Sequence, residues 1–410
     1  MNIVLIQPKA AHSWEALNLG YLKAYAQQFD KGWKFKFYSG YFDSDNTILE
    51  GCRGADFIGF SCTTPQLVHA KELIGKLRER NCRAKIIIGG VHASAQPRHV
   101  LPLVDYVVQG EGEMPLVAIL QGKVKPGIIK MPEISKLDSL PYPDRDFIKQ
   151  ERNIVVTQRN DNERIGAISS LRGCPFKCAF CSSRAIWGKP RLHSAKRVVD
   201  EMEYLVKNWG IEFIKFSDDT FTLDEERVLD ICRLKRIKNL DVEWGCNIRA
   251  NTSENVLRKM KEAKCREVWI GAESGSPHVL REMRKGITVD MVENIFEVTK
   301  KLGFHRRVYF LLGWPTETEE DIELTRKLAE KIDADQYGFA ILVPFPNTTT
   351  FQPWMLDGLD WANIDTYSNP WARTNTIDNN RLKEIQSEFK ERFSGKMCFR
   401  QKEKIVDGGI

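Results

Sequence analysis

The chain has 410 residues, a formal net charge of +6, and apolar and aromatic fractions of 42% and 10%. This length and composition predict more than one globular domain, each with a buried core. No run of residues approaches the roughly 18 consecutive apolar residues of a membrane helix, and the N-terminus lacks the pattern of a signal or transit peptide. The basic residues are spread along helical stretches, so their charge indicates no nucleic-acid partner. We therefore expect a cytoplasmic protein with no membrane partner.

Residues 1–131 alternate short apolar runs with amphipathic stretches. The expected strands lie at residues 2–7, 34–38, 56–61, 85–89 and 106–109, and the expected helices at 15–28, 65–80 and 113–120. This alternation predicts an α/β domain with a doubly wound parallel sheet, that is, a Rossmann-like fold. Such a sheet binds its ligand at the carboxyl ends of the strands.

Polar or glycine-rich loops follow most of these strands. Their notable residues are Ser61, Thr63, Thr64, Gly89, Gly90, Val91, His92, Gly110, Glu111 and Gly112. Glycine lets the backbone approach a ligand closely, so we expect these loops to face one. For any one of these loops taken alone, an ordinary turn is the better interpretation.

Residues 132–161 are expected to be a linker, because the periodic pattern weakens and residues 140–146 contain two prolines. A second βα series covers residues 162–350. Its six expected strands lie near residues 167–171, 213–217, 243–247, 267–271, 308–312 and 338–342. Six βα units predict a partial TIM-like barrel with its chemistry at the carboxyl ends of the strands.

Residues 351–410 form an expected C-terminal tail that is short and mostly helical. Its aromatic residues Trp354, Trp361, Tyr367 and Trp371 are interleaved with polar ones, and a charged helix is expected over residues 380–393. The pattern allows two interpretations. The aromatic residues either cover a substrate as a lid or dock the C-terminal helix onto the barrel wall.

Three of the ten cysteines are clustered, because Cys174, Cys178 and Cys181 form a CxxxCxxC run directly after the first strand of the second series. The seven others occur singly, in contexts typical of buried thiols: Cys52, Cys62, Cys82, Cys232, Cys246, Cys265 and Cys398. A closed zinc site requires four protein ligands, and His193, the nearest histidine, lacks the spacing of a fourth. Three thiolates on a four-iron cluster leave one iron open for a substrate. The run therefore favours an iron–sulfur cluster over zinc.

The cysteine run, with an aromatic residue before its last cysteine, resembles the radical S-adenosylmethionine (SAM) superfamily. Over roughly residues 1–350 the chain resembles the branch of that superfamily with an N-terminal cobalamin-binding domain. The segments that carry the resemblance are residues 59–61, 89–93, 110–113, 216–221, 271–275 and 313–318. Their order along the chain follows the pattern of that branch.

The resemblance implies that Cys174, Cys178 and Cys181 hold a [4Fe–4S] cluster, whose open iron chelates SAM and whose electron yields a 5′-deoxyadenosyl radical. Phe180 is then expected near the adenine. Asp218 and Asp219 are expected at the SAM ammonium group, and Arg249 at its carboxylate. Asp218 as a helix cap and Arg249 in a structural salt bridge are the alternatives.

The remaining residues implied at SAM lie after later strands of the barrel. Glu273 and Ser274 are expected to contact the ribose. Gly313, Pro315 and Glu317 are expected to border the adenine. A small-molecule substrate and a low-potential electron donor such as flavodoxin or ferredoxin are the implied partners.

The resemblance also implies cobalamin at the strand ends of the first domain, on the loop residues named above. The Asp-x-His-x-x-Gly pattern that supplies a lower cobalt ligand in other cobalamin domains is absent. His12 is the candidate in that loop, and an ordinary exposed histidine is the better interpretation.

We expect the enzyme to methylate an unactivated carbon, with one SAM as methyl donor and another as radical source. The tail from Trp354 to Trp371 is then expected to shield the radical from solvent. Cyclisation, rearrangement or coupling without methyl transfer is the first alternative. The second is a non-catalytic iron–sulfur electron carrier, against which the SAM-site segments argue.

Overall fold

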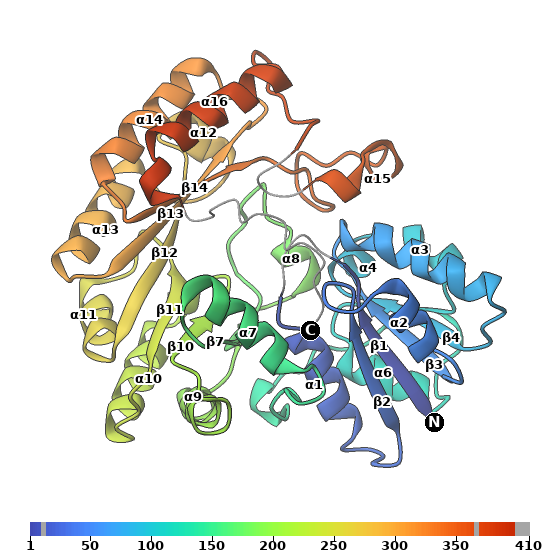
Figure 1. The fold of residues 1–410 in the computed structure, drawn as a ribbon. Helices are drawn as coiled ribbons and strands as arrows, with labels where there is room; N and C mark the ends of the chain where they lie inside the picture. Colours follow the sequence, from blue (N-terminus) through green and yellow to red (C-terminus); the bar gives the residue numbers. More distant parts are fainter. Residues whose placement is uncertain (10–13, 365–368, 398–410) are drawn as a thin grey trace. The chain divides into compact units, whose positions relative to one another are not determined.

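The computed structural model of the chain describes residues 1–9, 14–364 and 369–397. These residues form two compact units (Figure 1). The first unit comprises the described residues of 1–176, 181–219 and 344–365, and the second comprises the described residues of 177–180, 220–343 and 366–410. Both units are built from parallel strands joined by helices.

The first unit contains the doubly wound parallel sheet that the sequence predicts. Its strand order is β2-β1-β3-β4-β5-β6. The strands are β1 (Asn2–Gln7), β2 (Lys34–Ser39), β3 (Phe57–Ser61), β4 (Lys85–Gly89), β5 (Tyr106–Gln109) and β6 (Gly127–Lys130). The first five match the expected strands to within one residue. The edge strand β6 was not expected, because only two apolar residues mark it.

Alternate side chains of the central strands enter two different apolar layers. Ile3 and Leu5 of β1 pack into one layer with α1 and α6, whereas Val4 and Ile6 pack into the other with α2, α3 and the α4–α5 segment. The helices are α1 (Leu17–Ala26), α2 (Asp45–Gly51), α3 (Gln66–Glu79), α4 (Val91–Ala95), α5 (Pro97–Val100) and α6 (Glu113–Leu120). Strands covered on both faces read as continuous apolar runs, so polar groups collect in the loops where the strands end.

The remainder of the first unit includes the connector and the start of the second βα series. Its further elements are η1 (Leu101–Leu103), η2 (Leu137–Ser139), α7 (Gln150–Asp161), β7 (Ile165–Ile168), β8 (Leu171–Arg172), α8 (Ser183–Ile186), β9 (Arg191–Leu192), α9 (Ala195–Trp209), β10 (Phe213–Phe216), α15 (Met355–Gly358) and η4 (Trp361–Asn363). Strands β7 and β10 pair in parallel, and β8 and β9 form a short antiparallel ribbon. The expected linker therefore contains a 3₁₀ turn and a helix.

The connector is fixed by the buried side chain of Arg145, which is 1% exposed. Its guanidinium lies 3.2 Å from the Glu15 carboxylate and 2.9 Å from that of Glu201, and it donates to the Ala167 carbonyl. Burial raises the pKa of Glu15, and the Arg145 charge opposes that rise. Arg145 thus joins α9, the strand β7 and the segment before α1.

The second unit is built on four parallel strands in the order β14-β13-β12-β11. They are β11 (Glu243–Ile248), β12 (Cys265–Glu273), β13 (His305–Leu312) and β14 (Gln336–Ile341). The other elements are η3 (Phe221–Leu223), α10 (Glu225–Ile237), α11 (Glu254–Glu262), α12 (Pro277–Glu282), α13 (Val289–Lys301), α14 (Glu319–Ile332), α16 (Asn379–Arg392) and η5 (Ser394–Lys396). Together with β7 and β10, these strands are the six that the sequence predicts.

The expected charged helix of the tail is α16, and it packs on β14. The ring of Phe389 lies 4.5 Å from that of Phe339, and the Gln386 side chain donates to the Phe339 carbonyl. Phe389 is fully buried. The helix is therefore part of the core of the second unit.

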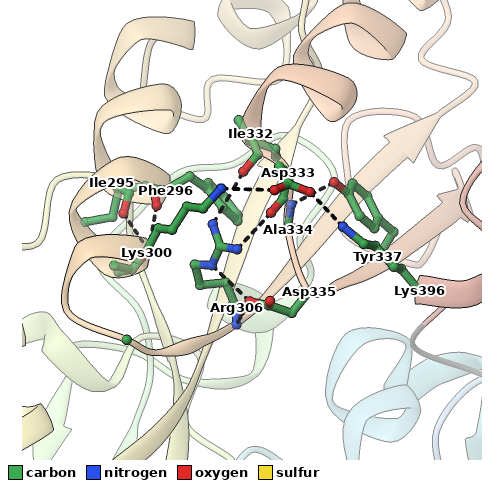
Figure 2. A network of polar contacts seen from close by, with 12 residues as sticks. Ile295, Phe296, Lys300, Arg306, Ile332, Asp333, Ala334, Asp335, Tyr337 and Lys396 are labelled. Carbon is green, nitrogen blue, oxygen red and sulfur yellow. Dashed lines mark hydrogen bonds and ion pairs between the residues drawn. The ribbon is translucent and has the colours of Figure 1, made fainter.

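A polar network closes the amino ends of β13 and β14 (Figure 2). The Arg306 guanidinium, 4% exposed, donates to Asp335 at 2.9 Å and to the Asp333 carbonyl at 2.8 Å. Hydrogen bonds from Lys396 and Lys300 lower the pKa of the Asp333 carboxyl to about 2. The network ties α13, α14 and the segment after α16 together, at the strand ends opposite those expected to carry chemistry.

Among the described residues, no helix is both long enough and apolar enough to cross a membrane.

We predict that Arg145→Met lowers the free energy of unfolding by roughly 3 to 5 kcal/mol, because it leaves the buried carboxylate of Glu15 without a cation and that of Glu201 with Arg197 alone. Urea unfolding at pH 7 measures this change. Arg53→Met, at an ion pair whose arginine is 76% exposed, is the control and should change stability by less than about 0.5 kcal/mol. Equal effects of the two substitutions would contradict the role given to Arg145.

Candidate functional site

The three clustered cysteines lie on the segment between β8 and α8. Cys174 and Cys178 are half-buried and Cys181 is exposed. Gly173, at φ +93°, turns the chain out of β8 in a conformation that favours glycine. The described residues contain no three His, Cys, Asp or Glu side chains already grouped as metal ligands. The fit to an iron–sulfur cluster therefore rests on the donors themselves, three accessible thiols on one segment.

The isolated cysteines lie in surroundings of a different kind. Cys52, Cys62, Cys232, Cys246 and Cys265 are buried, as expected, whereas Cys82 is half-buried. Burial raises the pKa of Cys52 to about 12 and that of Cys232 to about 12, so both stay protonated thiols at neutral pH.

His193, which the sequence argued against as a fourth ligand, is buried and engaged. Its Nδ1 lies 2.9 Å from Asp138 Oδ1, and burial lowers its pKa to about 4. His12, Tyr367 and Cys398 lie outside the described residues.

The two aspartates expected at the SAM ammonium group have different surroundings. Asp218 is buried and accepts hydrogen bonds from the backbone of Ser170 at 2.7 Å and Leu171 at 3.1 Å, and from the Ser170 hydroxyl. Asp219 is exposed and bonds the Ser183 hydroxyl. Asp218 therefore links the ends of β7 and β10, and Asp219 is the more accessible carboxylate.

In the second unit, Glu273, Arg249 and Phe180 meet around Lys285, a residue that sequence reasoning missed. The Lys285 ammonium lies 2.6 Å from the Glu273 carboxylate and 5.7 Å from the centre of the Phe180 ring. The Arg249 guanidinium donates to the Lys285 carbonyl at 2.5 Å. The structure thus brings together three of the expected SAM residues and adds a cation.

The backbone around Glu273 is shaped for this arrangement. Glu273 has a φ of +63°, which turns the chain sharply at the end of β12. A Cβ on Gly271 would lie 2.3 Å from Glu273 Oε1 and 2.8 Å from Lys285 Nζ, so a side chain there would displace the ion pair. The ion pair of Glu273 and Lys285 therefore requires glycine two positions before Glu273, at the end of β12.

Ser274, the other residue expected at the ribose, is fully buried. Its hydroxyl lies 3.2 Å from that of Thr325 and accepts from the backbone of Ser276 at 3.1 Å. These contacts brace the loop before α12.

The loop after β13 is held by its own glutamate. Glu317 is fully buried and accepts from the Gly313 backbone at 2.6 Å. Burial raises the pKa of this carboxyl to about 8, although the backbone of Gly313 and Trp314 opposes the rise. The Pro315 carbonyl accepts from Asn375 at 2.7 Å. In these contacts Glu317 fixes the shape of a loop whose backbone was expected to border adenine.

The expected cobalamin loops of the first unit lie together at the carboxyl ends of β3, β4 and β5. A Cβ on Gly90 would lie 2.7 Å from the Cys62 backbone nitrogen, so the loops after β3 and β4 touch here. The space around Gly110 is open, because no atom lies within 4 Å of its Cβ position. Both glycines have φ near +90°. Close backbone approach at this edge fits a large flat ligand such as a corrin.

Polar side chains in these loops mostly bond within the protein. The Ser61 hydroxyl accepts from Asn18, and the Thr63 backbone donates to Gln66. Buried His92 contacts Thr64 at 3.1 Å and His99 at 2.9 Å. Burial first, and then the His99 charge, lowers the His92 pKa to about 4, so this ring is neutral at pH 7.

The remaining residues expected at cobalamin are placed as follows. Gly89 is in ordinary contact, its Cβ position 3.5 Å from Val108 Cβ, and Val91 begins α4. The Glu111 carboxylate is buried at ion-pair distance from two arginines. Gly112 lies against Leu22 of α1.

The aromatic residues of the tail differ in exposure. Trp361 is 5% exposed, and Trp354 and Trp371 are 60% and 53% exposed. The Trp361 ring stacks on Phe345 and lines a cavity of about 350 Å³ in the first unit. The other lining residues come from α3, the α4–α5 segment and residues 356–360: Thr64, Leu67, Val68, Lys71, Glu72, His92, His99, Leu356, Asp357, Leu359 and Asp360. Trp361 is thus a packing residue, and the two other indoles face solvent.

Comparison with known families finds two matches in different parts of the chain. The model of the radical SAM superfamily matches residues 168–329, and the model of the B12 binding domain matches residues 4–120. An uncharacterized methyltransferase of Pyrococcus horikoshii is 33% identical over 346 residues, which cover 79% of this chain and 73% of that protein. The anaerobic magnesium-protoporphyrin IX monomethyl ester cyclase of Rubrivivax gelatinosus is 26% identical, over 83% of this chain and 66% of that protein.

A solved structure has the same fold. It is the radical SAM methyltransferase TsrM of Kitasatospora setae with tryptophan and a SAM analogue bound, and it superposes with a TM-score of 0.70. The match covers 85% of this chain and 74% of that one, at 21% sequence identity.

We predict that Glu273→Ala and Arg249→Ala each weaken SAM binding about 10- to 150-fold, since a hydrogen bond to a charged group contributes roughly 1.5 to 3 kcal/mol. Equilibrium dialysis of labelled SAM against iron-loaded protein measures the dissociation constant. Glu262→Ala, on an exposed glutamate paired with Lys259 in the same unit, is the matched control. Unchanged SAM affinity in both variants would show that the site is misplaced, and loss of iron would indicate a structural role.

Proposed function

Because this chain belongs to the B12-binding branch of the radical SAM superfamily, we propose that it is a cobalamin-dependent radical SAM methyltransferase acting on an unactivated carbon of a small molecule. SAM is cleaved reductively to a 5′-deoxyadenosyl radical, which removes hydrogen from the substrate. The family assignment rests on the two matching domains and the 33% identity to the Pyrococcus horikoshii protein. That the methylated carbon is an unactivated one is part of the proposal.

The observation that carries this proposal is the segment with Cys174, Cys178 and Cys181 after β8. Its three thiols are exposed or half-buried, in a chain whose other described cysteines, apart from Cys82, are buried. When bound, a [4Fe–4S] cluster supplies the electron that breaks SAM, and cobalamin supplies a methyl carrier. The three thiols would hold the cluster and leave one iron for SAM.

The residues of the second unit bind and orient SAM in this proposal. The Glu273 carboxylate accepts from the ribose hydroxyls, the Arg249 guanidinium faces the SAM carboxylate, and the Phe180 ring contacts the adenine. Lys285 holds the Glu273 side chain in place through their 2.6 Å ion pair. In the first unit, Asp219 is the exposed aspartate, so the proposal assigns the SAM ammonium to it in preference to Asp218.

The first unit holds cobalamin at the edge formed by the loops after β3, β4 and β5. The loops at Gly110, Gly90 and Cys62 would hold the corrin, because the Cβ position of Gly110 is open and the backbones of Gly90 and Cys62 touch. The electron comes from a low-potential donor such as flavodoxin or ferredoxin, and we place the enzyme in the cytoplasm, where such donors act.

One observation favours a second function. The matching cyclase of Rubrivivax gelatinosus carries a name for ring formation. Radical cyclisation without methyl transfer is therefore the alternative candidate, and it uses the same cluster and SAM site.

Incubation with methyl-deuterated SAM separates the two functions. The anaerobic reaction contains reconstituted enzyme, hydroxocobalamin, a reductant and a small-molecule extract, and the products are analysed by mass spectrometry. Methyl transfer predicts a product that gains one trideuteromethyl group. Products that form with 5′-deoxyadenosine but carry no deuterium would support cyclisation and contradict methyl transfer.

We predict that Gly110→Val lowers cobalamin retention at least tenfold, because its side chain fills the open space at the sheet edge, while the iron content reached by reconstitution without cobalamin is unchanged. Absorbance after gel filtration with hydroxocobalamin measures the retained cofactor. Gly122→Val is the matched control, because Gly122 also has a positive φ, +66°, and open space at its Cβ position, but lies after α6 and away from the edge. Equal losses in the two variants would point to backbone strain and contradict a corrin at Gly110.

The exposed indoles of the tail belong to a substrate lid in this proposal. Trp354→Ala and Trp371→Ala should leave the thermal midpoint within a few degrees of the wild type and still allow SAM cleavage, but lower product formation per deoxyadenosine. Trp361→Ala, at a 5% exposed indole, should instead lower stability by roughly 3 to 5 kcal/mol. Unchanged product yield in both exposed-indole variants would contradict the lid.

A further inference from the structure

Two carboxylates that follow β5, one in the loop and one at the start of α6, pair with two arginines that flank the cysteine segment. Glu113 Oε1 lies 2.6 Å from a guanidinium nitrogen of Arg172. Glu111 Oε1 lies 3.0 Å from Arg172 and 2.8 Å from Arg191. These four side chains, which we call the carboxylate–arginine clamp, all belong to the first unit.

The clamp is buried, so its charges depend on one another. The four side chains are 4% to 11% exposed. Burial opposes the charge of Arg172, yet the pKa of this residue is raised because Glu113 and Glu111 outweigh that effect. The Arg172 guanidinium also lies over the rings of Tyr21 and Trp187, at 5.5 Å and 5.4 Å. Removing either carboxylate would leave Arg172 with a single buried counter-charge in place of two.

The arginines stand at the two ends of the cysteine segment. Arg172 in β8 and Arg191 in β9 are paired opposite each other in the antiparallel ribbon. All three clustered cysteines lie on the chain between them, at residues 173–190. The clamp therefore closes this loop at its base.

Further contacts extend the attachment along the same segment. The Ile134 backbone donates to Glu111 Oε2 at 2.7 Å, and Arg191 donates to the Ile134 carbonyl at 2.8 Å. The Gly188 backbone donates to the Glu133 carboxylate at 2.6 Å. The helix α8, which follows Cys181, lies against α4 at the end of β4. The cysteine segment is thus attached to loops at the carboxyl ends of both β4 and β5.

The same loops form the edge where cobalamin is proposed to bind. Gly110, with open space at its Cβ position, directly precedes Glu111, and Gly112 separates the two carboxylates. A ligand resting on Gly110 would restrict the backbone that carries the clamp. Arg172 and Arg191 pair with the carboxylates on that backbone, so their own motion would be restricted too. The ends of the cysteine segment, where the two arginines lie, would then also be held in place.

We infer that Glu111 and Glu113 are positioning residues that couple cobalamin binding to the order of the cysteine segment. This inference rests on the proposed function, because it takes cobalamin as the ligand at Gly110. Coupling between two sites is reciprocal, so the cluster strengthens cobalamin binding by the same factor by which cobalamin stabilises the cluster. The clamp thereby favours assembly of the cluster in chains that already hold cobalamin.

Hydrogen exchange of full-length protein prepared without iron tests the coupling directly. Peptides from residues 173–190 are followed with and without hydroxocobalamin at saturating concentration. In the wild type we expect cobalamin to slow their exchange roughly fivefold or more, the low end of typical coupling factors. In Glu113→Gln and in Glu111→Gln, the ratio of the exchange rates without and with cobalamin should fall to near one, although cobalamin is still present at saturation.

Two further variants separate positioning from general damage. Arg172→Lys keeps the charge but loses the planar fork that reaches both carboxylates, so it should retain only part of the slowing. Glu50→Gln, at an exposed ion pair with Arg80 in the same unit, should retain all of it. If the clamp had only a structural role, the two Gln variants would raise exchange of residues 173–190 equally with and without cobalamin. The ratio of the two exchange rates would then stay as in the wild type.

The outcomes also distinguish the inference from the function on which it rests. A wild type that retains no hydroxocobalamin would contradict the proposed function and with it the coupling. A wild type that retains hydroxocobalamin, but whose residues 173–190 exchange at the same rate with and without it, would contradict the coupling alone. A slowing of exchange by cobalamin that survives in both Gln variants would also contradict the coupling alone.

Discussion

Parallel strands that are covered on both faces place nearly all of their chemistry at one edge. In the first unit, residues 3–6 of β1 enter opposite apolar layers in turn, so the polar side chains of this strand are confined to its two ends. The functional groups must then come from the loops where strands end, and the parallel order brings these loops together. The glycines after β4 and β5, the aspartates after β10 and the glutamate that ends β12 all follow from this constraint.

At such an edge, polar residues divide between shaping the loops and contacting a ligand. Asp218, Ser274 and Glu317 are buried and bond neighbouring backbone or hydroxyl groups, which fixes the loops that carry them. Glu273 instead bonds a side chain, Lys285, and is the carboxylate that we propose accepts from the ribose hydroxyls. Glu111 serves a third purpose, because its arginine partners lie at the base of the cysteine segment.

Much of the fold could be predicted from the sequence, because long apolar runs specify buried strands. The structure confirms the expected strands β1 to β5 of the first sheet, the expected strands of the barrel and the charged helix α16. The comparisons confirm the expected radical SAM family with its B12-binding domain. The edge strand β6 was missed because only Ile128 and Ile129 mark it. The helix α7 was missed because its polar sequence has few buried residues.

The sequence allowed the cysteines of the site to be predicted, but not the side chains that pair with Glu273 and Glu111. The three cysteines could be identified because their spacing lies within one short segment. Lys285 could not, because it is twelve residues from Glu273 and meets it only after α12 turns the chain back. The arginine partners of Glu111 are likewise about 60 to 80 residues away along the sequence, and only the folded ribbon brings them there.

The central claim is that Cys174, Cys178 and Cys181 hold the cluster that cleaves SAM. The most direct measurement is the yield of 5′-deoxyadenosine from SAM after anaerobic reconstitution with iron and sulfide, followed by reduction. The wild type should carry about four irons per chain and release 5′-deoxyadenosine, and the variant with all three cysteines replaced by alanine should do neither. Undiminished 5′-deoxyadenosine from that triple variant would contradict the claim.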